Sequence, residues 1–348
     1  MLLGLVDGVL SAPPYVVLAL AYGLVYGMLG MMDLSIPLRF TAAAYGGVLA
    51  QEVLRRYPPA DPAVLGTAVV GALLVGTSCQ TALLPFLAAR PLALLVASLG
   101  LSYVIQAILQ GAFGADPLTF LYYPVEGGVE FFGLTATPLQ LMSVAYSIAA
   151  CCAVAILLRR AEWGRRVIAV GGDHEVAATV FALSRRRIAF EVTAVTSLVL
   201  APAAIFYGAS HGVSPATGVD MGLLAFVAAI VAGRGAPVTA ALVVLALVIV
   251  RSMSLFVSAW MIIVIVLVAV ISLAIVERER SNPRRRAAIL LSLFGAAALA
   301  ATAERLLPAP MQVPIPAGFQ ELVPYAAVLL TLLVRSPQTH LSASIRQV

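Results

Sequence analysis

The sequence predicts an all-α, polytopic membrane protein with about eight to eleven transmembrane or re-entrant helices. Hydrophobic residues make up 62% of the 348 residues and charged residues only 11%, whereas a soluble domain carries about 25% charged residues. The mean hydropathy is +1.03. Apolar runs are spread along the whole length, so residues 1–348 are interpreted as a single transmembrane domain.

The apolar runs fall into four successive regions. N-terminal helices occupy 1–160, a charged cytoplasmic loop 161–188, further core helices 189–276, and a basic loop with a C-terminal hairpin 277–348. A spanning helix needs about 20 apolar residues, and several runs are shorter than that. The candidate segments are 13–31, 39–54, 62–86, 91–113, 139–159, 189–209, 220–233, 237–251, 254–276, 287–304 and 322–335.

The arginines set the orientation of these segments. All 21 basic residues are arginine, and the net charge is +5. The densest loops are 159–187 and 277–286, and the positive-inside rule places both in the cytoplasm. The stretch 114–138 has acids and no arginine, so we expect it outside, together with 305–321. Because the arginines gather beside apolar runs, they indicate membrane topology rather than nucleic-acid binding.

Two pairs of short segments are separated by helix-breaking residues. Asp33–Pro37 separates one pair near the N-terminus, and Gly233–Pro237 separates another in the second half of the chain. Short apolar segments interrupted by Gly or Pro point to discontinuous helices around a site near the membrane midplane. Ordinary tight turns between helices explain the pattern equally well, and both interpretations stay open.

Ionisable side chains near the apolar runs are few. Asp33, Arg39, Asp220, Arg234 and Arg251 lie at segment ends, where we favour interfacial anchoring over function. Asp33 is the exception, since it lies inside one of the two breaks. No Ser/His/Asp grouping and no paired carboxylates occur within the apolar runs, and the histidines fit no metal-ligand spacing. We therefore expect no catalytic site, no metal and no cofactor bound by this chain.

The charged loop contains a short Ala-rich stretch, 173–183, held between clusters of arginine. It can form a helix whose apolar side chains recur at i, i+4 and i+7, with Asp173 as the N-cap. Such a helix could dock on a cytoplasmic protein; contact of the arginines with lipid headgroups alone is the alternative. The residues assigned to docking are Asp173, His174, Glu175, Val176, Ala177, Ala178, Val180 and Leu183.

The absence of lysine excludes two kinds of chemistry. A P-loop needs a lysine that reaches the β- and γ-phosphates, and a Schiff-base enzyme needs an amine. The sequence contains no lysine. If ATP drives this protein, ATP and Mg must bind to a separate chain.

Several blocks, in order, resemble the permease subunits of branched-chain amino acid ABC importers, a family that includes urea and short-chain amide permeases. Leu20–Gly30 is similar to the family's first core helix, Ala42–Gly46 to the segment after its helix break, and Leu157–Phe181 to its basic loop with a coupling helix. No single block is specific to the family, but the occurrence of the blocks in the same order as in the family is specific. The other blocks are Leu84–Pro117, Tyr207–Pro215, Gly222–Pro237 and Leu329–Pro337.

The resemblance implies a bacterial inner-membrane subunit that works by alternating access. Its implied partners are two ABC ATPase subunits, a second permease subunit that is a copy or a paralogue, a periplasmic or lipid-anchored binding protein, and membrane lipid. The implied cargo is a branched-chain or hydrophobic amino acid or a related small polar solute. We assign Tyr22, Tyr26, Asp33 and Ser35 to the substrate pathway; plain helix packing also explains the two tyrosines.

The chain departs from the family at four places. In the coupling loop, Glu175–Ala178 stands for the family's usual Glu-Ala-Ala, and Ala182 stands at the following glycine position. Met32–Pro37 stands where members usually carry an asparagine, a phenylalanine and a histidine–glycine pair, which leaves the cargo open. Arg234 replaces a glycine, and 287–321 resembles an added hairpin. The alternative function is an ATP-independent carrier or channel. A carrier would need acids or an unwound polar site deep in its spans, and only Asp33 could qualify.

Overall fold

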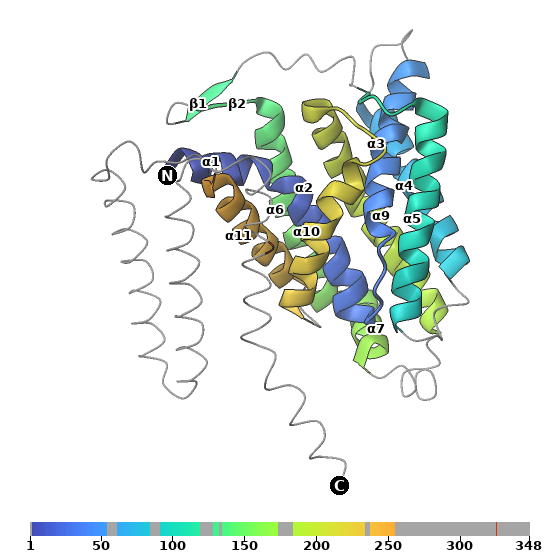
Figure 1. Ribbon diagram of the computed structural model, residues 1–348. Helices are drawn as coiled ribbons and strands as arrows, with labels where there is room; N and C mark the ends of the chain where they lie inside the picture. The colour runs from blue at the N-terminus through green and yellow to red at the C-terminus, as the bar shows by residue number, and fades with distance from the viewer. Residues whose placement is uncertain are drawn as a thin grey trace, which may run out of the picture. The chain divides into compact units, whose positions relative to one another are not determined.

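The computed structural model describes residues 2–53, 61–83, 91–118, 128–131, 134–172, 184–233 and 237–254, and Tyr325. The described residues form helices apart from one short hairpin (Figure 1), and the all-α polytopic fold expected from the composition is confirmed. The elements are α1 (Leu2–Ser11), α2 (Pro13–Tyr22), η1 (Gly23–Met28), α3 (Ile36–Val53), α4 (Asp61–Leu83), α5 (Pro91–Phe113), β1 (Val129–Phe131), β2 (Leu134–Ala136), α6 (Pro138–Arg160), α7 (Glu162–Gly172), α9 (Arg185–His211), α10 (Thr217–Ala232) and α11 (Pro237–Ser254).

The chain divides into two compact units, Met1–Gly8 with Leu247–Val348, and Val9–Ala246. In the described part of the first unit, the Ser252 hydroxyl donates a hydrogen bond to the Asp7 carboxylate at 2.6 Å. All the residues of the candidate site belong to the second unit. The domain boundaries predicted at residues 160, 188 and 276 stay predictions.

Among the described residues, four helices are long and apolar enough to cross a membrane: α4, α5, α6 and α9. A fifth span results if α1 is counted together with the continuous run of α2 and η1, from which it is separated by a bend at Ala12. α10 and α11 are apolar but shorter. α1 was not expected, because no candidate segment began before residue 13. The expected segments beyond residue 254 lie outside the described residues, apart from Tyr325.

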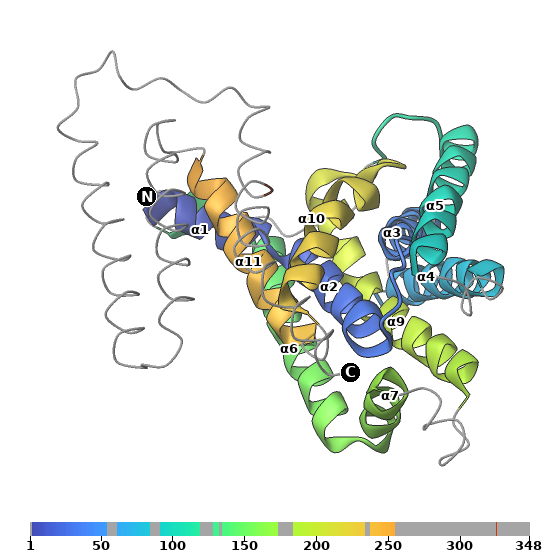
Figure 2. The ribbon, with the colours of Figure 1, turned by 60° about the horizontal axis from the view of Figure 1, so that its bottom comes forward.

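α2 lies in the interior of the second unit. All of its residues except Tyr15 are buried, as is expected of a helix that is apolar on every side. It packs against α10, α6 and α9, and Figure 2 shows it between α10 and α6. The polar site described below therefore follows a helical run whose first part, α2, is almost completely buried.

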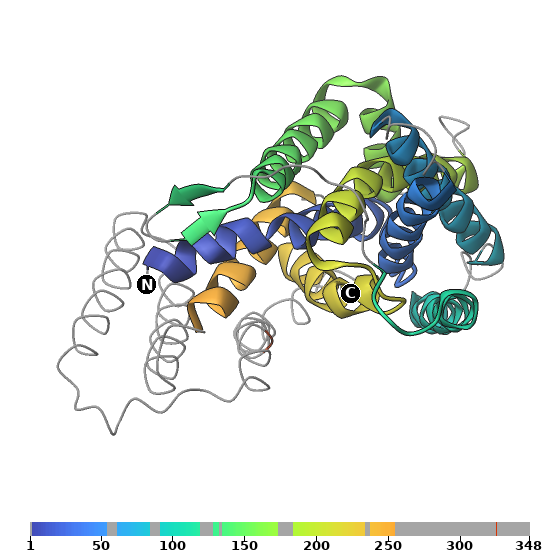
Figure 3. The ribbon, with the colours of Figure 1, turned by 90° about the horizontal axis from the view of Figure 1, so that it is seen from above.

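α5 lies at the edge of the bundle, as Figure 3 shows from above. Only 17% of its apolar window is buried, and large side chains such as Val96, Val104 and Ile108 are more than half exposed. A soluble protein rarely exposes so continuous an apolar surface. The same surface is favourable in the hydrocarbon core of a membrane, where backbone groups are already bonded within the helix.

Within the second unit, α3, α4 and α9 pack extensively against one another. Glycines permit the close contact of α3 with α4. A Cβ atom at Gly46 would lie 2.8 Å from the carbonyl oxygen of Thr67, and one at Gly71 would lie 2.9 Å from that of Ala42. Small residues at these crossings let two backbones approach closely, as is common between membrane helices.

Besides α1, the sequence analysis missed α7 and a β-hairpin. α7 forms in the charged loop ahead of 173–183, and its Glu162 and Arg166 make an i,i+4 ion pair at 3.5 Å. The hairpin of β1 and β2 forms within 114–138, for which the sequence analysis predicted no regular element. The docking stretch 173–183 itself lies outside the described residues, so its helix stays a prediction.

Gly218→Ala is expected to destabilise the protein, because Gly218 is where α10 crosses α3. Its N–H donates to the Thr41 hydroxyl at 3.0 Å, and a Cβ atom there would collide with the carbonyl oxygen of Pro37. The expected loss is about 1–3 kcal/mol, measured as a lower melting temperature in detergent. Gly100→Ala on α5 is the control, because a Cβ atom there meets nothing within 4 Å. Equal melting of the two variants would contradict this account of the crossing.

Candidate functional site

The helical path is interrupted between η1 and α3 by residues 30–35, which we call the break. η1 is a π-helical segment that continues α2 without a gap, and such segments are frequent at functional sites. The break begins one residue after Leu29, the C-cap of η1, at Gly30, whose N–H donates to the carbonyl of Tyr26 at 2.9 Å. The φ angle of Gly30 is +65°, a value that glycine adopts without steric cost.

The break lies at mid-depth of the neighbouring spans. Leu34 is hydrogen-bonded to Ser98 and Ser102, which lie in the middle of the 23-residue helix α5. In Figure 1 the chain accordingly rises from the end of η1 before α3 begins. Asp33–Pro37 is therefore not a tight turn between two complete spans; α3 starts inside the bundle. For Gly233–Pro237, residues 234–236 lie outside the described residues and both interpretations stay open.

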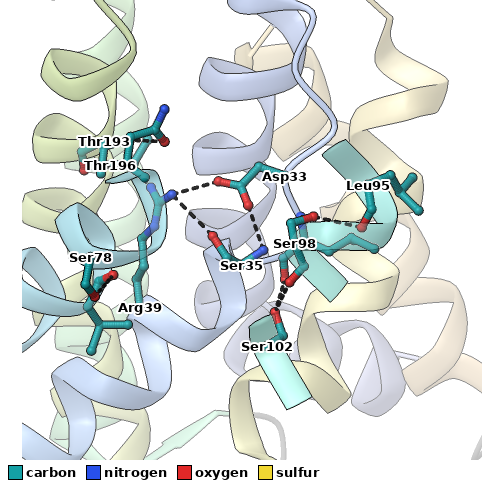
Figure 4. A network of polar contacts seen from close by, with 12 residues as sticks. Asp33, Ser35, Arg39, Ser78, Leu95, Ser98, Ser102, Thr193 and Thr196 are labelled. Atoms are coloured by element: carbon teal, nitrogen blue, oxygen red, sulfur yellow. Dashed lines mark hydrogen bonds and ion pairs between the residues drawn. The ribbon is translucent and has the colours of Figure 1, made fainter. Parts of the chain in front are cut away.

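A buried ion pair joins the break to α3. The NH2 atom of Arg39 lies 2.7 Å from Oδ2 of Asp33, and the exposed fractions of the two side chains are 0% and 1% (Figure 4). Arg39 is the largest fully buried side chain of the described residues. A buried charge is costly unless it is paired and hydrogen-bonded, so each residue of this pair requires the other.

Interfacial anchoring was therefore the wrong interpretation of Arg39, whereas Asp33 had been set apart because it lies in the break. Both are buried, and they lie at the level of Ser98 and Ser102 rather than at a helix end on the surface. Asp220 is exposed, which fits the expected position at an interface. Arg234 lies outside the described residues.

The unwound backbone of the break obtains its hydrogen bonds from side chains. The N–H of Leu34 donates to the Ser98 hydroxyl at 2.9 Å, and its carbonyl accepts from the Ser102 hydroxyl at 2.9 Å. The N–H of Ser35 donates to Oδ1 of Asp33 at 2.8 Å. Irregular backbone at membrane depth is tolerated only where protein or water supplies such partners.

A second set of polar side chains continues the network onto α9 and α4. The NH1 atom of Arg39 donates to the Thr196 hydroxyl at 3.1 Å, and Thr196 donates in turn to the carbonyl of Thr193. The Thr193 hydroxyl donates to Oε1 of Gln80 at 3.2 Å. Five helical or unwound segments thus meet in one network: the break, α3, α4, α5 and α9 (Figure 4).

Two of the four predicted pathway residues, Asp33 and Ser35, meet in this network. The Ser35 hydroxyl accepts from Arg39 at 3.5 Å. Tyr22 is buried in α2 with its ring centroid 5.3 Å from that of Phe226, and its hydroxyl has no hydrogen-bond partner among the described residues. Tyr26 is half-buried in η1. The structure does not test the assignment of any of the four to a pathway.

Several members of the network were missed by the sequence analysis. Arg39 was named there as an ionisable residue but was assigned to interfacial anchoring, although a charge beside an apolar segment should be considered functional by default. Ser98, Ser102, Thr193 and Thr196 carried no such signal, because hydroxyl residues are ordinary in membrane helices. Within the described residues, no group of three or more His, Cys, Asp or Glu could hold a metal ion.

Several membrane-spanning helices, a helix that begins inside the bundle and a polar network at mid-depth together define the class: a multi-pass transport permease. Residues 4–275 match the family described as branched-chain amino acid transport system, permease component, and the chain belongs to this family. The match ends before 287–321, the hairpin that the sequence suggested as an addition. No curated protein and no solved structure matched the chain.

A double-mutant cycle should show that Asp33 and Arg39 depend on each other. Asp33→Asn or Arg39→Gln alone leaves an unpaired buried charge, which is expected to cost about 3–5 kcal/mol of stability. The double variant keeps two amides that can hydrogen-bond, so it should melt above both single variants in detergent. Glu162→Gln with Arg166→Gln, in the exposed pair of α7, is the control and should show no such rescue. Additive losses at Asp33 and Arg39 would rule out the coupling.

Proposed function

We propose that this chain is the membrane-spanning subunit of an ATP-binding-cassette importer in the bacterial inner membrane. Its cargo is a branched-chain or other hydrophobic amino acid, or a related small polar solute. The observation that carries the proposal is the family match over residues 4–275, together with a helix break at mid-depth whose backbone is held by side chains. Two such subunits, copies or paralogues, enclose the pathway, and a periplasmic or lipid-anchored binding protein delivers the solute.

Energy comes from partner subunits. Because the chain has no lysine, it cannot supply a P-loop lysine, and two ATPase subunits bind ATP and Mg instead. The coupling stretch is 173–183, with Asp173, His174, Glu175, Val176, Ala177, Ala178, Val180 and Leu183 as the docking residues. α7, directly before it, packs against α6, α9 and η1. A movement of the loop is therefore transmitted through α7 to η1, and from η1 to the break.

The solute pathway passes the break. Asp33 and Ser35, with Tyr22 and Tyr26 on the helical run that leads into the break, supply polar contacts in an otherwise apolar lining. Regions 114–138 and 210–219 receive the binding protein; Leu118 and Val213 from these two regions pair through backbone hydrogen bonds of 2.8 Å. Alternating access then requires the helices around the break to move between two packings.

The second candidate is an ATP-independent carrier or channel. A proton- or sodium-coupled carrier needs an acid that can bind the coupling ion, and Asp33 is the residue that could serve. Its carboxylate is already bonded to Arg39 and to the Ser35 N–H, which favours the importer.

Affinity-tagged protein from its native host is expected to carry ATPase subunits with it, and solute uptake is expected to stop when cellular ATP is depleted. Mass spectrometry of the purified complex and a radiolabelled leucine uptake assay measure these two results. Uptake that continues without ATP, from a chain that never co-purifies with an ATPase, would favour the carrier.

Glu175→Ala, or replacement of 173–183 by a Gly-rich segment, is expected to abolish transport while leaving membrane insertion intact. The physical reason is that the variant permease folds but no longer receives the movement of the ATPases. Uptake, the amount of protein in the membrane and co-purified ATPase are measured together. Arg187→Gln, which changes an exposed arginine in the first turn of α9 outside the docking stretch, is the control. Normal uptake by the Glu175 and Gly-rich variants would remove the coupling assignment.

A further inference from the structure

Three buried hydrogen-bond donors beside the ion pair have no acceptor among the described residues. They are Nε of Arg39, Nε2 of Gln80 and the hydroxyl of Ser197. All three side chains are at least 99% buried. Native proteins rarely leave buried donors unpaired, so three in one place call for a group that supplies acceptor oxygens.

The side chains that carry these donors lie near one glycine of α4, Gly76. A Cβ atom there would lie 2.8 Å from Oγ of Ser197 and 3.3 Å from Cδ of Arg39, the atom bonded to Nε. Gln80 follows one turn later on α4, and its hydrogen-bond partner Thr193 has a methyl group that would lie 3.2 Å from the same Cβ. Side chains from α3, α4 and α9 that carry unpaired donors are therefore packed close together beside Gly76.

The charges of this region select a particular kind of solute. Asp33 neutralises Arg39, so a solute with a net charge would leave one charge unpaired in a buried site. The Asp33 carboxylate accepts two hydrogen bonds from the described residues, whereas a carboxylate has about four acceptor positions. A zwitterion offers an anionic acceptor to the three donors and a cationic donor to Asp33.

We infer that Arg39, Gln80 and Ser197 form the subsite for the carboxylate of a zwitterionic solute, and that Asp33 contacts its ammonium group. The inference rests on the proposed function, to which it adds three residues that bind the carboxylate and a contact of Asp33 with the ammonium group. Because these side chains are buried, the solute reaches them when α3, α4 and α9 move apart during alternating access.

Binding of radiolabelled L-leucine to the full-length chain in lipid nanodiscs tests the subsite. Unlabelled leucine is expected to compete at least about tenfold better than leucinamide, which lacks the carboxylate, or 4-methylpentanoate, which lacks the ammonium group. Gln80→Leu and Ser197→Ala should each weaken leucine binding about tenfold and reduce its advantage over leucinamide, since each removes one hydrogen bond to a charged group.

Two variants provide matched controls. Gln106→Leu on α5 and Ser147→Ala on α6 remove the same side chains outside the subsite, and both should bind leucine as the wild type does. The inference is overturned if the wild-type chain shows no saturable leucine binding or if leucinamide competes as well as leucine. It is also overturned if Gln80→Leu and Ser197→Ala bind leucine like the controls, as they would if the donors held only an ordered water.

The uptake assay separates this inference from the proposed function. ATP-independent uptake together with carboxylate-dependent binding would reject the importer and support the subsite. ATP-driven uptake without carboxylate-dependent binding would reject the subsite alone.

Discussion

The ion pair between Asp33 and Arg39 is the interaction that permits a helix to start in the middle of this bundle. A charge in the membrane interior is tolerated when an opposite charge and further hydrogen bonds surround it. Arg39 meets this condition through Asp33, Ser35 and Thr196, which belong to the break and to α9. One guanidinium thus fixes the unwound segment to two helices, and the path of the chain from η1 to α3 follows from that attachment.

The distribution of polarity across the bundle is consistent with this arrangement. Apolar side chains cover the outside of α5 and α6, while Gln80, Ser98, Ser102, Thr193 and Thr196 of α4, α5 and α9 are buried in the network around Arg39. In a soluble protein the opposite distribution is expected, with apolar side chains inside and polar side chains on the surface. The polar network is confined to one buried place in a largely apolar interior, and the apolar exterior is what the lipid requires.

Composition and residue order were sufficient to predict the helical membrane fold and its family, because both depend on patterns spread over most of the chain. They were sufficient to locate the break as well, since Asp33, Ser35 and Pro37 disfavour a helix locally. They did not predict the partners of the break. Ser98 and Thr196 lie 64 and 157 residues away from the groups that they bind, and no local pattern encodes such distances. α7 was missed for a related reason. Its segment is rich in arginine and was interpreted as a loop, and its packing against distant segments is not visible in the local sequence.

The bonds between Leu34 and α5 have a consequence for how this family member can vary. Both bonds use the main chain of residue 34, so any amino acid with a backbone N–H can occupy that position without losing them. Ser98 and Ser102 contribute side chains, and their replacement would leave main-chain groups of the break without partners. Selection on the conformation of the break therefore acts at two positions in another helix. Substitutions should accumulate more freely at the irregular residue than in the regular helix that supports it.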